Sequence, residues 1–248
     1  MASQNFSNLA SFLVLSAGFG MLLALPNAGC GDSSAPTAPV SVRVTEYIEL
    51  TNLETPMPGA EVCETDTANC TMTDAEGMAT LNLPDESEVS YTITKEGFGS
   101  YLVSDVNDGN LEPWFWMYDD EELARLAELM GTTYPWTDDG IIVMREFSRE
   151  GFEFSVMFDL VDQPNDAFYF LDGDTPSTDL DSTTDDGRGG FTDVAPGEYE
   201  VELIGADFPV VCAAFTAWPS AFRNRVRVPI KAGYISYASM SCEQGAAP

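Results

Sequence analysis

The sequence predicts a mainly β protein, built from two antiparallel β-sandwich domains with a short helical insertion between them. Three observations support this class. Several short segments alternate apolar and polar residues with a period of two, turn-forming residues separate these segments, and one segment has helical spacing. Alternation with one polar face is typical of antiparallel sheets, and short strands between turn clusters are typical of sandwiches.

The alternating segments lie in both halves of the chain. In EYEVEL, Tyr199, Val201 and Leu203 point to one face and three glutamates point to the other. A strand with this pattern buries its apolar face and leaves the glutamates in water. The clearest segments are VSVRV (40–44), EVSYTIT (88–94), EYEVEL (198–203) and RVRVPI (225–230).

Residues 119–131, DDEELARLAELMG, break this pattern and predict a helix. The apolar residues with helical spacing are Leu123, Leu126 and Met130. Asp119 or Asp120 can cap the first turn, and Gly131 supplies a C-terminal stop. This helix and its flanking loops divide the two β-rich halves, which predicts a helical and aromatic insertion at residues 106–140.

The N-terminal segment predicts export. Residues 9–25 are apolar or small throughout, Pro26 ends the run, and Ala28-Gly29-Cys30 follows. Such a run before small residues is typical of a signal peptide, because a membrane-spanning helix needs about 20 apolar residues. The segment resembles a bacterial lipoprotein signal, which implies that residues 1–29 are removed and that Cys30 is acylated.

The lipoprotein resemblance also implies a location. In that family an Asp after the cysteine marks inner-membrane retention in some bacteria, and this chain has Gly31 there. The outer membrane or cell surface is therefore expected. Residues 30–39, rich in Ser, Ala and Pro, are predicted to form a flexible tether. An ordinary secretory signal, or an uncleaved anchor, is the alternative.

Acidic residues dominate the charge. The chain has 41 Asp and Glu against 10 Lys and Arg, for a net charge of −31 at pH 7. This charge repels phosphate backbones and anionic membrane surfaces, so we expect no nucleic-acid partner and a membrane attachment through the lipid anchor alone. The acidity favours either cation binding or solubility in a salty medium.

Four cysteines besides Cys30 predict two disulfides. An even number of cysteines is typical of exported chains, and four cysteines allow three connectivities. Local pairing joins Cys63 to Cys70 across a short loop, and Cys212 to Cys242 between two strand-like segments. A four-cysteine zinc site is the alternative, although the chain has no CxxC pair.

The two halves of the chain resemble each other. Each holds a Thr-Asp turn with a glycine, a short strand, a proline turn and an alternating strand, and Gly77 and Gly187 can take the positive φ that such turns need. The patterns resemble the carboxypeptidase-regulatory-like domain, a transthyretin-like (prealbumin-like) β-sandwich. The motifs that carry this resemblance lie at residues 58–60, 73–77, 95–98, 189–191 and 196–199.

This resemblance implies one sandwich at residues 40–105 and a second at residues 141–248. It implies no catalysis, because in carboxypeptidases this module is an accessory to a separate zinc domain. Related sandwiches bind starch or other glycans, or act as spacers and adhesin stalks.

The residue types agree with a protein that is not an enzyme. The chain contains no histidine, which removes Ser-His-Asp and Cys-His catalysis and any zinc site with His ligands. It also has no phosphate-binding GxxxxGK[ST] loop. We name no catalytic residue, and a hydrolase that uses two carboxylates is the alternative.

One acidic loop is a candidate calcium site. Calcium prefers clustered oxygen ligands in flexible loops, although the spacing here does not match an EF-hand. A solvated hairpin loop is the alternative, since Asp and Gly also favour turns. The candidate ligands are Asp172, Asp174, Asp179, Asp181, Asp185 and Asp186.

Aromatic residues on both sides of the predicted helix form a candidate glycan site. Trp114, Trp116 and Tyr118 would share one face if extended, and Trp136 follows the helix. Exposed aromatic faces can stack on sugars, whereas packing of the helix onto a sandwich is the alternative. The sequence thus predicts a non-enzymatic lipoprotein with a binding, adhesion or structural role at the cell surface, with a protein or a glycan as its ligand.

Overall fold

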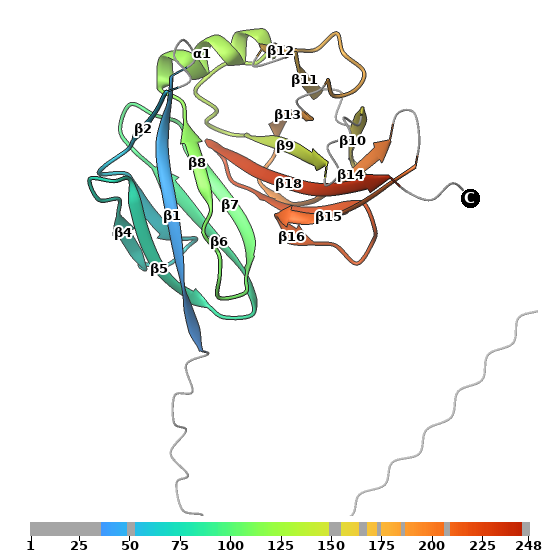
Figure 1. The fold of residues 1–248 in the computed structure, drawn as a ribbon. Coiled ribbons are helices and arrows are strands. Elements are labelled where there is room, and N and C mark those ends of the chain that lie inside the picture. The colour runs from blue at the N-terminus through green and yellow to red at the C-terminus, as the bar shows by residue number, and fades with distance from the viewer. Residues whose placement is uncertain are drawn as a thin grey trace, which may run out of the picture. The chain divides into compact units, whose positions relative to one another are not determined.

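The structure is a computed structural model that describes residues 36–48, 53–148, 155–163, 168–172, 175–184, 187–205 and 209–244. The predicted signal segment, Cys30 and most of the predicted tether lie outside the described residues. Ala35–Pro248 forms one compact unit, and its secondary structure is mainly β, as the sequence predicts (Figure 1). Within the described ranges, no helix is long and apolar enough to cross a membrane.

The first sheet, called the β1 sheet here, belongs to the N-terminal half. β1 lies at its centre, antiparallel to β2 and β5 and parallel to β8. Its strands are β1 (Thr37–Ile48), β2 (Leu53–Pro56), β5 (Met78–Pro84) and β8 (Trp114–Met117).

The second sheet has ten strands and crosses both halves of the chain, so we call it the shared sheet. Nine strands follow one path, and β15 (Val210–Thr216) pairs with β18 off this path. In spatial order the nine are β12 (Thr175–Ser177), β11 (Phe168–Asp172), β13 (Arg188–Val194), β9 (Gly140–Ser148), β18 (Tyr234–Gln244), β7 (Ser100–Asn107), β6 (Ser87–Thr94), β3 (Glu61–Glu64) and β4 (Cys70–Met72).

The third sheet, called the β14 sheet, belongs to the C-terminal half. Its strands are antiparallel, in the order β10-β14-β17-β16. They are β10 (Val156–Leu160), β14 (Gly197–Gly205), β17 (Arg225–Ile230) and β16 (Trp218–Pro219).

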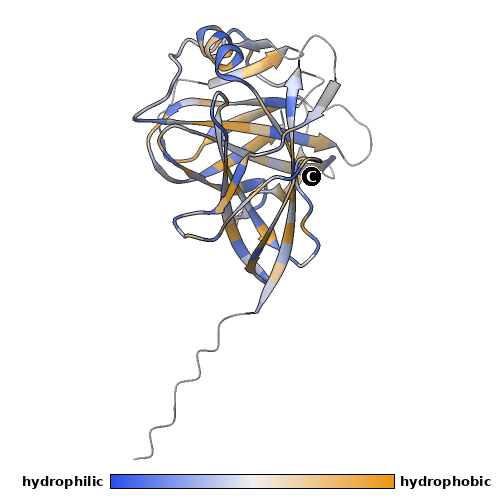
Figure 2. Cartoon of the chain, turned by 90° about the vertical axis from the view of Figure 1, so that its left-hand side faces the viewer, coloured by the Kyte–Doolittle hydropathy of each residue, from blue (hydrophilic) through white to orange (hydrophobic). Residues whose placement is uncertain are grey.

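Each outer sheet covers a different part of the shared sheet, which produces two hydrophobic cores. In the first core Val42 and Leu81 of the β1 sheet lie in one cluster with Tyr91 and Val103 of the shared sheet. In the second core the β14 sheet packs on β9, β13 and β18. Apolar and polar residues alternate along the strands (Figure 2), so each strand turns one face to a core.

One strand joins the two sandwiches. The first residues of β18 pair in parallel with β7 from Tyr234–Ser100 to Tyr237–Val103, and the other edge of β18 pairs in parallel with β9. β18 then continues alongside β15. Together with β1–β8, these are three parallel pairs among the described strands, where sequence alternation predicted antiparallel sheets alone. The division into domains 40–105 and 141–248 stays a prediction, while the sheet that crosses it is continuous.

The predicted insertion contains the helix α1 (Asp120–Leu129) and also the strand β8, which belongs to the β1 sheet. The side chain of Asp119 caps α1 by accepting a hydrogen bond of 2.7 Å from the amide of Glu122. This cap satisfies an amide that has no partner within the helix. Leu123 and Ala127 are buried against the first core, so the helical spacing predicted the buried face correctly.

Local features of the sequence also hold. Cys63 bonds to Cys70 and joins β3 to β4, whereas Cys212 bonds to Cys242 and joins β15 to β18. Both predicted disulfides are therefore present. Gly77 and Gly187 take positive φ values of 76° and 61°, as the turn pattern predicts.

Candidate ligand-binding groove

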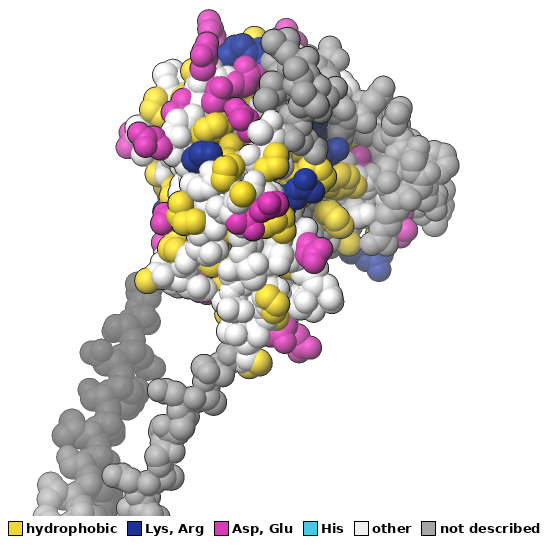
Figure 3. Space-filling model, turned by 60° about the vertical axis from the view of Figure 1, so that its left-hand side comes forward, with side chains coloured by type: hydrophobic (Ala, Val, Ile, Leu, Met, Phe, Trp, Pro, Cys, Tyr) yellow, Lys and Arg dark blue, Asp and Glu magenta, His cyan; other side chains and the backbone are white. Residues whose placement is uncertain are grey.

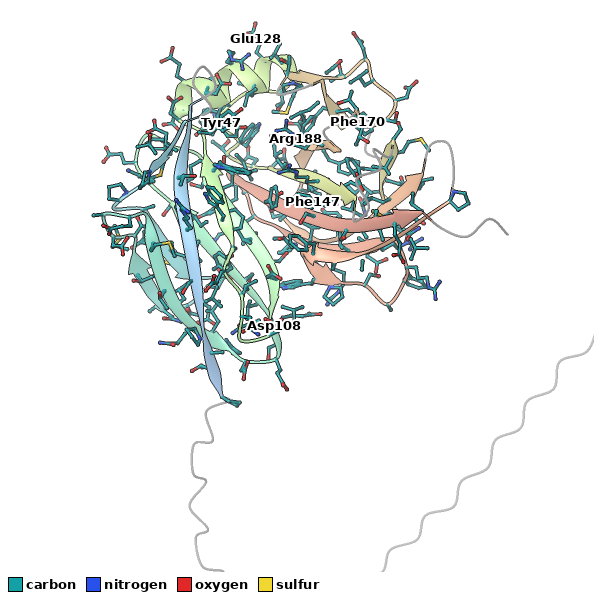
Figure 4. The ribbon with its side chains drawn as sticks, viewed as in Figure 1. Tyr47, Asp108, Glu128, Phe147, Phe170 and Arg188 are labelled. Carbon is teal, nitrogen blue, oxygen red and sulfur yellow. A yellow bond between two sulfur atoms is a disulfide. The ribbon has the colours of Figure 1, made fainter. Side chains whose placement is uncertain are left out.

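Beyond β7, one face of the shared sheet is not covered by the β1 sheet, and a groove lies there. The side chains of β9 alternate between this groove and the second core. Ile142 and Met144 lie in the core, whereas Val143 and Arg145 line the hollow between β9 and β8. Figure 4 shows Phe147 of β9 and Arg188 of β13 in the region between β8 and the C-terminal strands.

The groove has a volume of about 680 Å³ and receives side chains from β7, β8, β9, β15, β16, β18 and the loop before β8. Its aromatic and cationic lining consists of Trp114, Phe115, Trp116, Arg145, Phe147, Phe215 and Tyr237. Phe215 is 64% exposed and packs edge-on against Phe147, with 5.4 Å between the ring centroids. A concave, largely aromatic surface with a few polar groups is the usual form of a ligand site.

A smaller cavity of about 140 Å³ adjoins the groove beneath α1. Leu123 and Leu126 of α1 and Met130, directly after the helix, cover it, and Tyr169 and Trp136 contribute to its wall. The groove and the cavity share the residues Trp114, Phe115, Trp116, Arg145 and Tyr237. The two spaces therefore meet at these five side chains.

The two tryptophans of β8 form the wall of the groove opposite β9. Phe115 and Met117 point into the first core, so Trp114 and Trp116 lie on the other face of the strand. Their ring centroids are 5.6 Å apart, and Trp114 is 41% exposed. This pair lines both the groove and the adjoining cavity, and Tyr118 and Trp136 line that same cavity, so the structure brings all four predicted aromatic residues to one cavity.

Polar partners hold the ring of Trp114 in place. Its Nε1–H donates a hydrogen bond of 3.0 Å to Oγ1 of Thr45, and the guanidinium of Arg43 lies 4.6 Å from its ring centroid. A ring fixed in this way loses little side-chain entropy when a ligand stacks on it.

Figure 3 shows one face of the molecule, where hydrophobic side chains lie exposed among acidic and a few basic residues.

The other two aromatic candidates line the adjoining cavity but not the groove. Trp136 is 6% exposed and packs against Tyr134, with 4.9 Å between the ring centroids. Its ring belongs to the first core and lines the cavity but not the groove. Tyr118 is half-buried against Tyr47, also at 4.9 Å, and lines the same cavity. The exposed aromatic surface is therefore smaller than the sequence predicted.

Arg145 stands at the junction of groove and cavity. Its guanidinium lies 4.5 Å from the ring centroid of Phe147 and hydrogen-bonds to the phenol of Tyr237. Burial raises the pKa of this phenol, so Tyr237 is neutral at physiological pH. Among the described residues, no carboxylate forms an ion pair with Arg145.

Carboxylates also line the groove, from β7 and from the loop that follows it. Asp105, Asp108 and Glu112 belong to its lining. Asp105 is 6% exposed and accepts a hydrogen bond of 2.8 Å from the amide of Val106. Burial raises the pKa of this carboxyl from 3.8 to about 7, and Asp108 contributes in the same direction. The groove thus contains carboxylates as well as a guanidinium.

Sequence reasoning missed Arg145, Phe147, Phe215 and Asp105. The strand GIIVMREFS of β9 carries apolar residues on both faces, since one face lies in the second core and the other lines the groove. No period-two pattern marks such a strand. An arginine within this apolar run is the signal that could have directed attention to it.

The predicted calcium loop is only partly described. Asp179 and Asp181 are exposed, whereas the side chains of Asp172, Asp174, Asp185 and Asp186 lie outside the described residues. Calcium binding there stays a prediction. Among the described residues, one acidic and sulfur cluster brings Glu61 close to Cys63 and Cys70. Both of its sulfur atoms belong to a disulfide and offer no thiolate to a metal.

Comparison with known proteins gives limited similarity. No protein-family model matches the chain, and no curated protein matches it. Among solved structures, the minor pilin GBS52 of Streptococcus agalactiae has 13% sequence identity and a TM-score of 0.27, over 85% of this chain and 98% of that one.

Two further pilins match to a comparable degree. The shaft pilin SpaA of Lactobacillus rhamnosus GG has 12% identity and a TM-score of 0.25, over 86% of this chain and all of that one. A point mutant of the major pilin of Streptococcus pyogenes has 9% identity and a TM-score of 0.25, over 85% and 99% of the two chains. At these TM-scores, no property of the pilins is carried over to this chain.

Proposed function

We propose that this chain is an exported, non-enzymatic binding protein of the cell envelope, which holds a carbohydrate in the groove between β8 and β9. One observation carries the proposal: Trp114 and Trp116 lie side by side, 5.6 Å apart, on the wall of a 680 Å³ groove. The C–H faces of sugar rings pack well on aromatic rings, while their hydroxyls need polar partners. Asp105, Asp108 and Glu112 offer such acceptors within the same groove.

The burial of Trp114 supports binding over packing. A tryptophan that serves only the fold buries most of its surface, whereas Trp114 keeps 41% exposed. The groove adds the more strongly exposed Phe215 to the same surface. Apolar surface of this kind on a strongly acidic protein is usually an interaction site.

Export and lipid anchoring complete the proposal. The resemblance of residues 1–30 to a lipoprotein signal supports an acylated Cys30 at the outer membrane or cell surface. The two disulfides agree with an oxidising compartment. Mass spectrometry of the protein from its native membrane fraction tests this step: a diacyl or triacyl group on a peptide that begins at Cys30 would support it. An unmodified N-terminal peptide would contradict it.

A carboxylate-dependent hydrolase is the second candidate, and Asp105 is the observation that favours it. A carboxyl with a pKa raised to about 7 has the protonation state that a general acid needs. We place binding first because glycoside hydrolysis also needs a second carboxylate at a defined distance on the other side of the sugar. Release of reducing ends from a bound oligosaccharide by the wild type, and its loss in Asp105→Asn, would favour the hydrolase.

The binding test compares two aromatic substitutions in the full chain. Trp114→Ala removes one wall of the groove, whereas Phe222→Ala removes an aromatic ring that is 62% exposed and does not line the groove. We expect Trp114→Ala to weaken glycan binding about tenfold or more in titration calorimetry, which corresponds to about 1.4 kcal/mol. Phe222→Ala should bind as the wild type does. Equal affinities for all three proteins, or no binding to any glycan of a broad array, would overturn the proposal.

A further inference from the structure

We infer that the carbohydrate bound in this groove carries carboxylate groups, and that Arg145 recognises them. The inference rests on the proposed function and specifies its ligand as an acidic heteroglycan, with uronic acid residues separated by neutral sugars. The observations that support it are the position of Arg145, its lack of an ion pair with a described carboxylate, and the aromatic and carboxylate side chains that line the same groove.

The position of Arg145 suits contact with a ligand. It lines both the open groove and the adjoining cavity. On the shared sheet it pairs in register with Ser239 of β18 and with Arg188 of β13. Neighbouring residues in register point to the same side of a sheet, so a hydroxyl and a second guanidinium flank Arg145 on the ligand-facing side.

The partners of Arg145 differ from those of Arg125, Arg225 and Arg227. Three described arginines pair with glutamates: Arg125 with Glu122, Arg225 with Glu200 and Glu202, and Arg227 with Glu88 and Glu198. Arg145 instead contacts a phenyl ring and a neutral phenol. Its buried Nε–H has no hydrogen-bond acceptor within the described part of the chain.

A partly buried guanidinium without a counter-ion is costly, and its planar fork fits a carboxylate with two parallel hydrogen bonds. Since no described carboxylate forms an ion pair with Arg145, a carboxylate of a ligand can take this position.

The rest of the groove restricts which acidic ligand fits. Trp114 and Trp116 favour sugar rings over a flexible acid, because each offers a flat apolar face. Asp105, Asp108 and Glu112 accept hydrogen bonds from hydroxyls but repel a second carboxylate nearby. The net charge of −31 adds a long-range repulsion of polyanions. A glycan with isolated carboxylates between neutral sugars satisfies all three conditions.

The test uses three oligosaccharides of equal length with the full chain, in titration calorimetry at 0.15 M salt. They are a neutral xylo-oligosaccharide, the same backbone with one glucuronic acid branch, and an oligogalacturonate with a carboxylate on every sugar. We expect the singly acidic compound to bind at least tenfold more tightly than the neutral and the fully acidic ones. The methyl ester of the glucuronic acid branch should lose this preference, which tests the carboxylate without any change to the protein.

Variants then test Arg145 itself. Arg145→Gln should reduce the preference for the acidic over the neutral compound from at least tenfold to about one, and Arg145→Lys should leave an intermediate preference, since lysine keeps the charge but not the fork. Arg223→Gln is the matched control, because it removes the same charge from an exposed turn that does not line the groove. It should keep the full preference.

The outcomes separate the two proposals. Equal binding of the neutral and acidic compounds, or an unchanged preference in a folded Arg145→Gln variant, would overturn the role of Arg145 and leave the proposed carbohydrate binding intact. Failure of all three compounds and of a broad glycan array to bind would overturn the proposed function as well.

Discussion

The indole Nε1–H of Trp218 donates a hydrogen bond of 2.8 Å to the carbonyl oxygen of Val89, a residue 129 positions away in the chain. Trp218 lies in β16 of the β14 sheet. Val89 lies in β6, a strand of the shared sheet, and its side chain belongs to the first core. Beside this contact Arg227 of β17 forms an ion pair with Glu88. The two sandwiches are thus connected twice: by the pairing of β18 with β7, and by these side chains.

Removal of the Trp218–Val89 hydrogen bond should destabilise the protein. Trp218→Phe keeps an aromatic ring but leaves the Val89 carbonyl without this donor, which costs about 1 to 2 kcal/mol of unfolding free energy. Urea denaturation measures this value. Phe222→Leu, a change at an exposed ring on a turn outside the shared sheet, is the control and should lie within about 0.5 kcal/mol of the wild type. An unchanged stability of Trp218→Phe would mean that the contact does not couple the sandwiches.

The shared sheet predicts one cooperative unfolding transition for both cores. Separate domains often unfold in separate steps, but separation of the two cores here would break the β18–β7 backbone pairing and the Trp218 contact at the same time. We expect far-ultraviolet circular dichroism and tryptophan fluorescence to report the same midpoint in urea. Two resolved transitions would show that the two cores unfold independently despite the continuous sheet.

The two disulfides should contribute unequally to stability. The Cys212–Cys242 bond closes a loop with a sequence separation of 30, against 7 for Cys63–Cys70. The chain-entropy model assigns about 3.5 kcal/mol to the longer loop and about 2.5 kcal/mol to the shorter one. Cys212 and Cys242 are also buried in the second core, so their loss removes packing as well. Denaturation of the two double Cys→Ala variants should place C212A/C242A as the less stable, and the reverse order would contradict the model.

Asp105 should make stability depend on pH. Its folded-state pKa of about 7 exceeds the ordinary 3.8, so between these values the folded state binds more protons than the unfolded state. The unfolding free energy therefore falls as pH rises from about 4 to about 7, and the full cost is present above pH 7. Asp105→Asn removes the titrating group.

We expect the stability of this variant relative to the wild type to rise between pH 4 and pH 8, by about 4 kcal/mol. Burial raises the pKa of Glu146 to about 7 as well. Its titration changes the unfolding free energy of both proteins equally, so this contribution cancels when the two are compared. Urea denaturation of both proteins at the two pH values measures the difference. The difference in unfolding free energy between the two proteins should be larger at pH 8 than at pH 4. A difference that is the same at both pH values, or smaller at pH 8, would contradict the raised pKa of Asp105.

Local patterns predicted the local structure well. The alternating segments became β1, β6, β14 and β17, and the segment with helical spacing became α1 with Asp119 as its cap. Short-range cysteine pairing was also correct. Each of these features depends on residues close together in the chain, where periodicity, capping and loop length act directly.

Long-range pairing left no such signal. The sequence predicts that the residues of β8 belong to an insertion, yet β8 pairs in parallel with β1. The parallel pairing of β18 with β7 joins segments more than 130 residues apart. Neither segment has a sequence feature that identifies the strand with which it pairs. A parallel strand can be buried on both faces, so its sequence reads as an apolar run without alternation.

The candidate groove shows the same division. The sequence alone predicted the mainly β class, the helix, the disulfides and an aromatic cluster around Trp114 and Trp116. These features depend on composition and periodicity, which act over short distances in the chain. Only the tertiary structure decided that Trp136 is buried and that Arg145 stands opposite these tryptophans. The physical reason is that exposure and charge environment depend on which distant strands pair, and in this chain one strand, β18, brings the two halves into a single sheet.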